Sequence, residues 1–431
     1  MSHTDSAVRH DNDAQLVAWA EAVAAQLAPS VAQHDAQGSF AFDHLDVLRR
    51  EGALALTIPQ TLGGRGLSLY QTLLFQRQLG RVSGPTALCL GWHLMAFGYL
   101  SQRPSWPAQT LQRLAQDVVQ RGDLINILVT ERDNGNLLRG AKPATVARRS
   151  GSGWVLSGHK AFCSSAPALR QMVVFASIEG EDRQGEFLVP RGPGVRVVET
   201  WDTLGMRATC SHDIVFDDVP LPDEALAHRF GPGPDQPSAF SVTSRAWGLQ
   251  LPALYLGIGE AARDVALGFA AGHHSASLGG VILDAPNVQA RLGEIELLLG
   301  AARAQLFGLA ERWERNPALQ DKLHHEVAIT KVVVGRQSQR AVALACEIVG
   351  GHANSRRLPL ERLLRDVQCS AFNPPQADAV VSQLARGATS AWRHRAAATT
   401  AAGVNAPPLA HPSADLQTSP STAPSGQPSA L

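Results

Sequence analysis

Residues 154–165 read WVLSGHKAFCSS, and this stretch decides how the chain is divided. Its first half is apolar or β-branched and is interrupted by a glycine, a pattern typical of a short strand. Four later segments repeat the pattern and are punctuated by Gly or Pro: 171–180 (QMVVFASIEG), 185–190 (GEFLVP), 194–199 (GVRVVE) and 212–222 (HDIVFDDVPLP). Together they predict a middle β domain over residues 123–234.

Helical patterns flank this β region on both sides. Residues 14–122 carry apolar side chains at spacings of three and four, as in 13–33 (DAQLVAWAEAVAAQLAPSVAQ), and they predict an N-terminal all-α domain. Residues 235–392 contain two longer runs of the same kind, 287–316 and 323–351. Both runs are long enough for an antiparallel arrangement, so we expect a C-terminal four-helix bundle.

The two ends of the chain have a different composition. Residues 1–13 are polar, and residues 393–431 are rich in Pro, Ser and Ala with few large apolar side chains. Such segments bury too little apolar surface to offset the entropy of ordering, and we expect both to be disordered. The fold class predicted is therefore α+β, with a helical domain, a β-barrel-like middle domain and a helical bundle.

Composition limits the partners of the protein. The 431 residues include 38 Lys plus Arg and 38 Asp plus Glu, which is not the charge balance of a nucleic-acid or membrane-surface binder. No segment approaches the ~20 consecutive apolar residues that a membrane-spanning helix needs. The five cysteines are scattered singly, which fits reduced thiols and argues against a metal site. We expect a cytoplasmic protein that binds a small molecule, not nucleic acid or a membrane.

Five stretches occur in an order that is informative about family: 58–68 (IPQTLGGRGLS), 128–136 (LVTERDNGN), 157–165 (SGHKAFCSS), 204–222 (LGMRATCSHDIVFDDVPLP) and 347–366 (EIVGGHANSRRLPLERLLRD). With them, about residues 14–390 resemble the acyl-CoA dehydrogenase superfamily, whose members hold FAD between the middle domain and the C-terminal bundle. The resemblance implies FAD as cofactor. It also implies a homodimer or homotetramer, because the last stretch often reaches the flavin of a neighbouring subunit in this family.

The resemblance assigns residues to the flavin. Val129 and Thr130 would contact the ring through backbone and hydroxyl groups, Phe162 would pack on it, and Ser164 would lie near its N5 atom. Asn136 would donate to the pyrophosphate. Without the resemblance, Thr130 and Ser164 are ordinary strand residues and Phe162 is a core residue, and this interpretation stays open.

The predicted phosphate end of the site departs from the family pattern. Gly350 and Gly351 would let backbone amides approach a phosphate, or would simply end a helix. Glu347 stands where many relatives have Gln, and its charge would oppose a diphosphate. The usual Arg is not recognisable, with His273 or His274 as weak substitutes. FMN, or a loosely held reduced flavin, is therefore the alternative to FAD.

The family's catalytic base is missing from its expected positions. Dehydrogenation needs a carboxylate aimed at the α-proton of the substrate. By the family's spacing, the two positions at which relatives carry this Glu fall on Pro374 and near Trp247, and neither residue accepts a proton. Glu131 remains a candidate base only if the backbone departs from family geometry.

The turn that follows Arg365 and Asp366 is also a good start for a helix. Asn373 is a suitable N-cap, Pro374 suits the first helical position, and Gln376 is placed for a variant of the capping box. The sequence therefore predicts a helix that begins at Pro374.

The same turn resembles a branch of the superfamily that includes dibenzothiophene monooxygenase. Phe372 and a Pro fit that branch, while Asn373 replaces its His. A second His of that branch lies on an N-terminal helix, where His93 is the match. His93 and Asn373 are thus the candidate catalytic residues, although a lone His on an apolar helix is usually a hydrogen-bonded core residue. Four aromatic residues are candidates for an apolar pocket: Trp92, Phe97, Trp247 and Phe372.

The sequence predicts a flavin-dependent oxidoreductase that lacks the usual α,β-dehydrogenation. The favoured activity is oxygen-dependent monooxygenation of a small apolar substrate, with a flavin reductase as candidate partner. Two alternatives stay open. One is an acyl-CoA dehydrogenase with an unusual base, and the other is a catalytically silent homologue that binds flavin or an acyl thioester.

Overall fold

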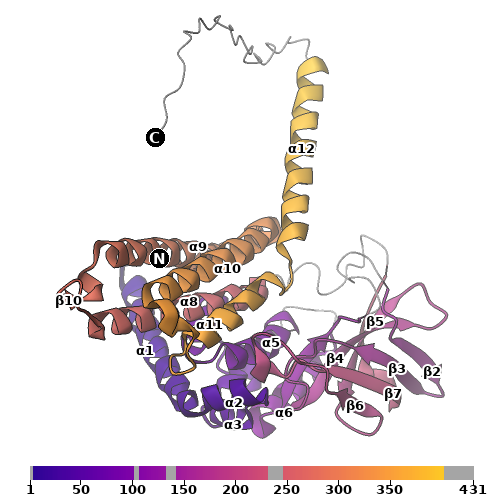
Figure 1. The fold of residues 1–431 in the computed structure, drawn as a ribbon. Coiled ribbons are helices and arrows are strands. Elements are labelled where there is room, and N and C mark those ends of the chain that lie inside the picture. The colour runs from indigo at the N-terminus through magenta and orange to yellow at the C-terminus, as the bar shows by residue number, and fades with distance from the viewer. Residues whose placement is uncertain (1–2, 101–105, 133–141, 232–245, 402–431) are drawn as a thin grey trace, which may run out of the picture. The chain divides into compact units, whose positions relative to one another are not determined.

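The computed structural model describes residues 3–100, 106–132, 142–231 and 246–401 (Figure 1). Six helices in these ranges precede the first strand. Local signals mark where a helix starts, as at Ser68, which caps the helix that begins at Leu69. The Ser68 hydroxyl accepts from the Gln71 amide, and the Gln71 side chain accepts from the Ser68 amide, which is a capping box. The helices are α1 (His3–Leu27), α2 (Val31–Gln37), α3 (Phe42–Arg50), α4 (Leu69–Val82), α5 (Gly84–Leu100) and α6 (Ala108–Arg121).

The strands between residues 124 and 230 form one sheet. They are β1 (Leu124–Leu128), β2 (Val146–Ser150), β3 (Gly153–Lys160), β4 (Leu169–Ile178), β5 (Gln184–Pro190), β6 (Val195–Val198), β7 (Asp213–Leu221) and β8 (Leu226–Phe230). The strand order is β6-β7-β3-β2-β4-β5-β8, and β1 pairs with β4 in parallel. Because β4 is long, its first half pairs with β1 and its end with β2, so two branches of the sheet meet there.

Helices return after the sheet. They are α8 (Gln250–Gly272), α9 (Pro286–Arg315), α10 (His324–Val349), α11 (Leu360–Gln368) and α12 (Ala377–Ala401), with a small hairpin of β9 (His274–Ser275) and β10 (Gly280–Val281). Figure 1 shows α8, α9 and α10 lying side by side, in agreement with their contacts. The contacts divide the chain into residues 1–380 and 381–431, and α12 spans this division.

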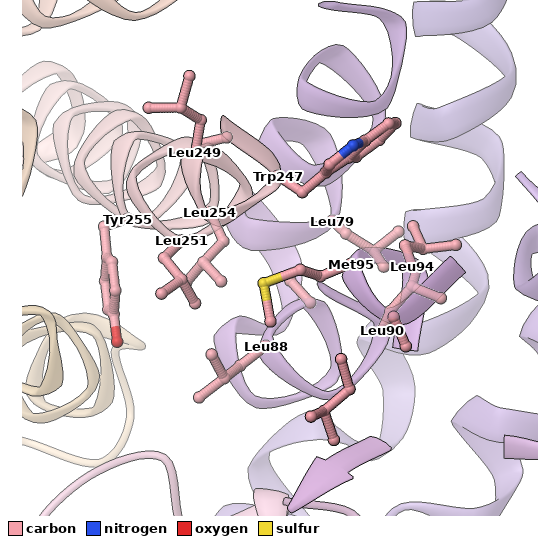
Figure 2. Close-up of a cluster of buried hydrophobic side chains, with 14 of the residues drawn as sticks. Leu79, Leu88, Leu90, Leu94, Met95, Trp247, Leu249, Leu251, Leu254 and Tyr255 are labelled. Carbon is pink, nitrogen blue, oxygen red and sulfur yellow. The ribbon is translucent and has the colours of Figure 1, made fainter. Parts of the chain in front are cut away.

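The N-terminal helices and α8 share one core. Figure 2 shows apolar side chains from α4, α5, the 3₁₀ turn Ala246–Leu249 and α8 meeting in a buried cluster. The backbones of α4 and α8 approach closely, since a Cβ added at Gly257 would lie 2.2 Å from the carbonyl oxygen of Arg77. The side chain of Trp247 packs closely on Gly98, since a Cβ added there would lie 2.3 Å from the indole ring. This core fixes α5 and α8 relative to each other.

The predicted α+β class is confirmed, with one correction. The description of the middle domain as barrel-like is loose, because in the described residues β6 and β8 end the strand order and do not pair with each other. The sheet is therefore open. The three-domain division at residues 123 and 235 remains a prediction.

The chain ends and the turn before α12 differ from the predictions. Helix α1 begins at His3, within the segment 1–13 that was expected to be disordered, because no Gly or Pro interrupts it. Helix α12 continues to Ala401, beyond residue 393, and residues 402–431 lie outside the described part. Helix α12 begins at Ala377 and not at Pro374, because Pro375 disfavours a helical backbone at Pro374 and because a side chain from another helix binds carbonyl groups of the preceding turn.

None of the helices in the described part of the chain combines the length and the apolar character that a membrane span needs.

Candidate functional site

One cavity of about 670 Å³ lies where the helical core meets the sheet. Five segments and Ser211 line it: residues of α5, the end of β1 with residues 129–131, residues 161–164 after β3, the loop 201–206, and residues 368–376 at and after the end of α11. Sites for small molecules are commonly concave, mostly apolar and of this size, about 300–1,000 Å³. This cavity is the candidate site.

Four of the residues predicted to contact a flavin line this one cavity: Val129, Thr130, Phe162 and Ser164. They come from two segments that follow different strands, so the fold brings them together. The backbone of Phe162 has a φ of 57°, which is unusual for a bulky residue and typical of ligand-binding sites. Ser164 is buried, and its hydroxyl lies 2.8 Å from that of Ser211, which also lines the cavity.

The cavity presents exposed apolar side chains. Phe162 is 53% exposed, Leu204 is 62% exposed and Phe372 is 75% exposed, and all three line it. Trp201, another lining residue, packs edge-on against Phe162 with ring centroids 6.2 Å apart. Large apolar groups exposed around one concavity indicate a ligand with apolar faces.

Glu131 is the one carboxylate residue among the described residues that line the cavity. Its Oε1 accepts from the Lys160 ammonium at 2.7 Å and from the backbone and hydroxyl of Thr145 at 2.9 and 2.6 Å, and its Oε2 accepts from the Ala144 amide. Burial alone raises its pKa, but Lys160 and these hydrogen bonds reverse the effect and lower the pKa to about 2. A carboxylate held in this way is a weak base.

The turn that carries Pro374, at the position where relatives have the catalytic base, borders the cavity. Phe372, Asn373 and Pro374 all line it. The carboxamide oxygen of Asn373 accepts a hydrogen bond from the hydroxyl of Tyr255, a fully buried residue of α8. Pro374, in the family's base position, brings no titratable group to the cavity.

His93 does not line the cavity. It is completely buried, its Nε2 donates to the Leu54 carbonyl at 2.8 Å, and its Nδ1 accepts from the Ile125 amide at 3.1 Å. Burial lowers the pKa of His93 to about 4, so the ring is neutral at pH 7. We therefore propose that His93 joins α5 to β1 and has no acid–base role.

The aromatic residues proposed for an apolar pocket divide into two pairs. Trp92 and Phe372 line the cavity. Phe97 and Trp247 are buried in the core beside it and are not among the lining residues. The second expected position for a base, near Trp247, thus carries a core side chain.

The predicted phosphate end is separate from the cavity. Gly350 and Gly351 are exposed in a 3₁₀ turn that follows α10 and do not line it. Glu347 binds Arg291 at 3.0 Å and Arg340 at 3.1 Å, so its charge is compensated within the chain. His273 stacks on Phe269 beside His352. Asn136 lies outside the described residues.

The loop 201–206 was missed from the sequence, although it forms one wall of the cavity. The buried carboxylate of Asp366 accepts from the Met206 amide at 2.6 Å, and Met206 has a left-handed backbone with a φ of 55°. Gly205 passes so close to α11 that an added Cβ would lie 2.2 Å from the Arg365 carbonyl oxygen. Gly205 within the quoted stretch 204–222 was the only signal, and a glycine alone does not reveal a loop that lines a cavity.

Comparison with known proteins gives matches along most of the chain. Three family descriptions match in order: the acyl-CoA dehydrogenase N-terminal domain at residues 11–111, the middle domain at 126–219 and the C-terminal domain at 249–372. A curated relative, the putative acyl-CoA dehydrogenase YdbM of Bacillus subtilis, is 37% identical over 380 residues, which are 88% of this chain and 97% of the relative.

Other relatives have different named activities. The L-evernosamine nitrososynthase of a Micromonospora species is 27% identical, over 81% of this chain and 84% of its own. A solved structure of TdsC, a dibenzothiophene monooxygenase from Paenibacillus sp. A11-2, in complex with FMN and indole has a TM-score of 0.75 and 25% identity. It covers 84% of this chain and 94% of TdsC.

Proposed function

Because the chain belongs to the acyl-CoA dehydrogenase family, we propose that it is a flavin-dependent oxidoreductase that converts a small molecule in the cavity described above. The predicted family is thereby confirmed. We further propose that its activity is oxygen-dependent monooxygenation of a small apolar substrate and not α,β-dehydrogenation. A separate flavin reductase would then supply reduced flavin, and the chain would assemble with copies of itself.

The residues present fit a flavin. Its ring is flat and apolar with polar edges, and the cavity offers exposed aromatic faces at Phe162 and Trp201 together with the hydroxyl of Ser164. Phe162 is held in an unusual backbone conformation beside this space. Val129 and Thr130 would contact the edge of the ring. A bound flavin supplies the redox chemistry, and the chain supplies position, polarity and exclusion of water.

The proposed reaction type rests on one observation: the carboxylate of Glu131, at the cavity, is already bound by other groups of the chain. Among the described lining residues only Glu131 has a carboxylate, and it is bound to Lys160, Thr145 and Ala144. The family's base positions hold Pro374 and a core residue near Trp247. Proton abstraction from carbon needs an available base in contact with the substrate, whereas flavin-dependent oxygen transfer to an apolar substrate needs a dry cavity and a proton donor.

A second candidate is acyl-CoA dehydrogenation. The 37% identical relative, named a putative acyl-CoA dehydrogenase, favours it. The nitrososynthase and TdsC, by contrast, favour chemistry on substrates other than acyl thioesters. Both candidates require a flavin, and they differ in how it is reduced.

One experiment separates the candidates. The purified protein is loaded with FMN or FAD and mixed without oxygen with butyryl-, octanoyl- or isovaleryl-CoA. Bleaching of the flavin absorbance would support dehydrogenation and contradict our proposal. We expect no bleaching, and we expect reduced flavin with ¹⁸O₂ to transfer labelled oxygen to indole or dibenzothiophene, measured by mass spectrometry. Failure to bind either flavin, in its oxidised or its reduced form, would contradict both candidates.

Ser164 provides a test of the flavin site itself. We expect Ser164→Ala to weaken FMN binding about three- to tenfold, because one hydrogen bond contributes about 0.5–1.5 kcal/mol. Fluorescence titration of FMN measures the change. Ser157→Ala is the control, since Ser157 lies on β3, bonds Asp218 and does not line the cavity. Equal losses of FMN affinity in both variants would argue against a flavin contact at Ser164.

A further inference from the structure

A buried lysine binds the backbone of the turn that borders the cavity. Lys331, on α10, is 5% exposed, and its ammonium donates to the carbonyl oxygens of Ser370 at 2.9 Å, Asn373 at 2.5 Å and Pro375 at 3.0 Å. An ammonium group has three N–H donors, so all three are used here. One side chain therefore holds together the carbonyl groups of a six-residue turn.

A second buried side chain holds the same turn. The hydroxyl of Tyr255 donates to the carboxamide oxygen of Asn373. Tyr255 and Lys331 come from different helices, α8 and α10, and bind the side chain and the main chain of one residue. No described residue accepts a hydrogen bond from the carboxamide nitrogen of Asn373, which is the end left to donate toward the cavity.

The ammonium of Lys331 has no ion-pair partner among the described residues. Burial lowers the pKa of Lys331 to about 8, and the three carbonyl oxygens favour the protonated form. A buried charge compensated only by backbone carbonyl groups contributes little net stability, because its desolvation offsets much of the attraction. A role in fixing local geometry explains its presence better.

We propose that Lys331 and Tyr255 are positioning residues, which fix the turn Ser370–Pro375 so that Asn373 stands at the cavity with its carboxamide nitrogen as a hydrogen-bond donor. The inference concerns the turn in the ligand-free protein. It rests on the proposed function only in assigning the cavity to a bound flavin and its substrate.

Cys369 allows the turn to be observed directly. It lines the cavity next to Ser370 and is partly exposed, and burial raises the pKa of its thiol to about 12, which slows its reaction in the intact turn. If the turn opens, the thiol becomes more exposed to water and its reaction with N-ethylmaleimide accelerates. The amides of Phe372 and Asn373, which both donate to the Cys369 carbonyl, report the same opening by hydrogen exchange.

The test compares variants without any turnover assay. In Lys331→Met we expect labelling of Cys369, followed by mass spectrometry, to be at least tenfold faster than in the wild type. Hydrogen exchange at Phe372 and Asn373 should accelerate similarly. Lys331→Arg, which keeps the charge and several donors, should retain most of the protection. Tyr255→Phe, which removes one oxygen atom and keeps the ring, should give a smaller increase.

The control variant is Leu344→Ala, a buried substitution on the same helix that does not touch the cavity. Comparison at equal loss of Tm separates opening of the turn from general destabilisation. The inference is overturned if Lys331→Met exposes Cys369 no more than Leu344→Ala does, or if Tyr255→Phe leaves labelling unchanged. Slowing of Cys369 labelling by FMN in the wild type tests the proposed function separately, so the two ideas can fail independently.

Discussion

Replacing Glu131 by Gln is expected to lower the free energy of unfolding by about 3–5 kcal/mol, because it leaves the charge of Lys160 buried without its partner. Lys160 is completely buried, and the two side chains are 2.7 Å apart. Glu131 also accepts from Ala144 and Thr145, so the variant weakens the link between residue 131 and the start of β2. Urea denaturation at pH 7 measures the loss.

The control for this variant is an exposed ion pair. Lys142 and Asp182 are bound in the same domain, but both side chains are more than half exposed. Asp182→Asn should therefore change stability by only about 0–1 kcal/mol. A Glu131→Gln variant as stable as Asp182→Asn would show that the buried pair contributes nothing beyond a surface pair.

The pH dependence of stability gives an independent measure of the same carboxylate. The pKa of Glu131 in the folded protein is about 2, below its ordinary value of 4.5. Its contribution to stability is thus fully present above pH 4.5 and is lost as the pH falls toward 2. We expect the wild type to lose more stability than Glu131→Gln between pH 5 and pH 3, and parallel profiles would contradict this assignment.

Gly257→Ala is expected to lower the free energy of unfolding by about 3 kcal/mol, at the upper end of the usual range for overpacking. The added methyl group would lie 2.2 Å from the carbonyl oxygen of Arg77 and 3.0 Å from the amide nitrogen of Arg81. Both are backbone atoms of α4 and cannot rotate away. The two helices must therefore separate, which disturbs the core under the cavity. Thermal and urea denaturation measure the effect.

Gly268 is the matched control on the same helix. It is exposed, and an added Cβ would meet no atom within 4 Å. Gly268→Ala should stabilise the protein by about 0.5–1 kcal/mol, because Ala has the higher helix propensity. Changes of the same sign in the two variants would argue that propensity, and not the close approach of α4 and α8, determines the outcome at Gly257.

The fold could be predicted from the sequence because local pattern and element type agree along most of the chain. The periodicity changes where β1 begins and changes again before α8, and β3, β4, β5, β6 and β7 were recognised from their composition, whereas β1, β2 and β8 were not. The open sheet could not be predicted, since whether β6 and β8 pair depends on the path of the whole sheet. The helical residues before Asp13 were missed because polar composition alone says little about a helix that lacks Gly and Pro.

Residues of the candidate site could be predicted from the sequence only where they belong to a recognisable motif. Val129, Thr130, Phe162 and Ser164 belong to two short stretches with a recognisable pattern, and the structure brings them to one cavity. The environment of His93 was not visible, because its two hydrogen-bond partners are backbone groups 39 and 32 residues away.

The turn after α11 was also predicted incorrectly because distant contacts shape it. Asn373 and Pro374 have the composition of a helix start, and from this composition the sequence predicts a helix that begins at Pro374. The helix begins at Ala377, since Pro375 disfavours a helical backbone at Pro374 and Lys331, about 40 residues earlier in the chain, binds the carbonyl groups of the turn. The Pro374–Pro375 pair is visible in the sequence, whereas the long-range hydrogen bonds of Lys331 leave no local pattern there.

Lys331 holds the turn Ser370–Pro375 in a way that determines which substitutions the turn tolerates during evolution. It recognises main-chain oxygen atoms, which every amino acid possesses, and not the side chains of the turn. Substitutions at Phe372 or Pro374, whose side chains are bound by neither Lys331 nor Tyr255, can therefore alter the chemistry offered to a substrate while the turn keeps its shape. A library randomised at these two codons, with Lys331, Tyr255 and Asn373 retained, should yield a high proportion of folded proteins and is a practical starting point for obtaining new activities.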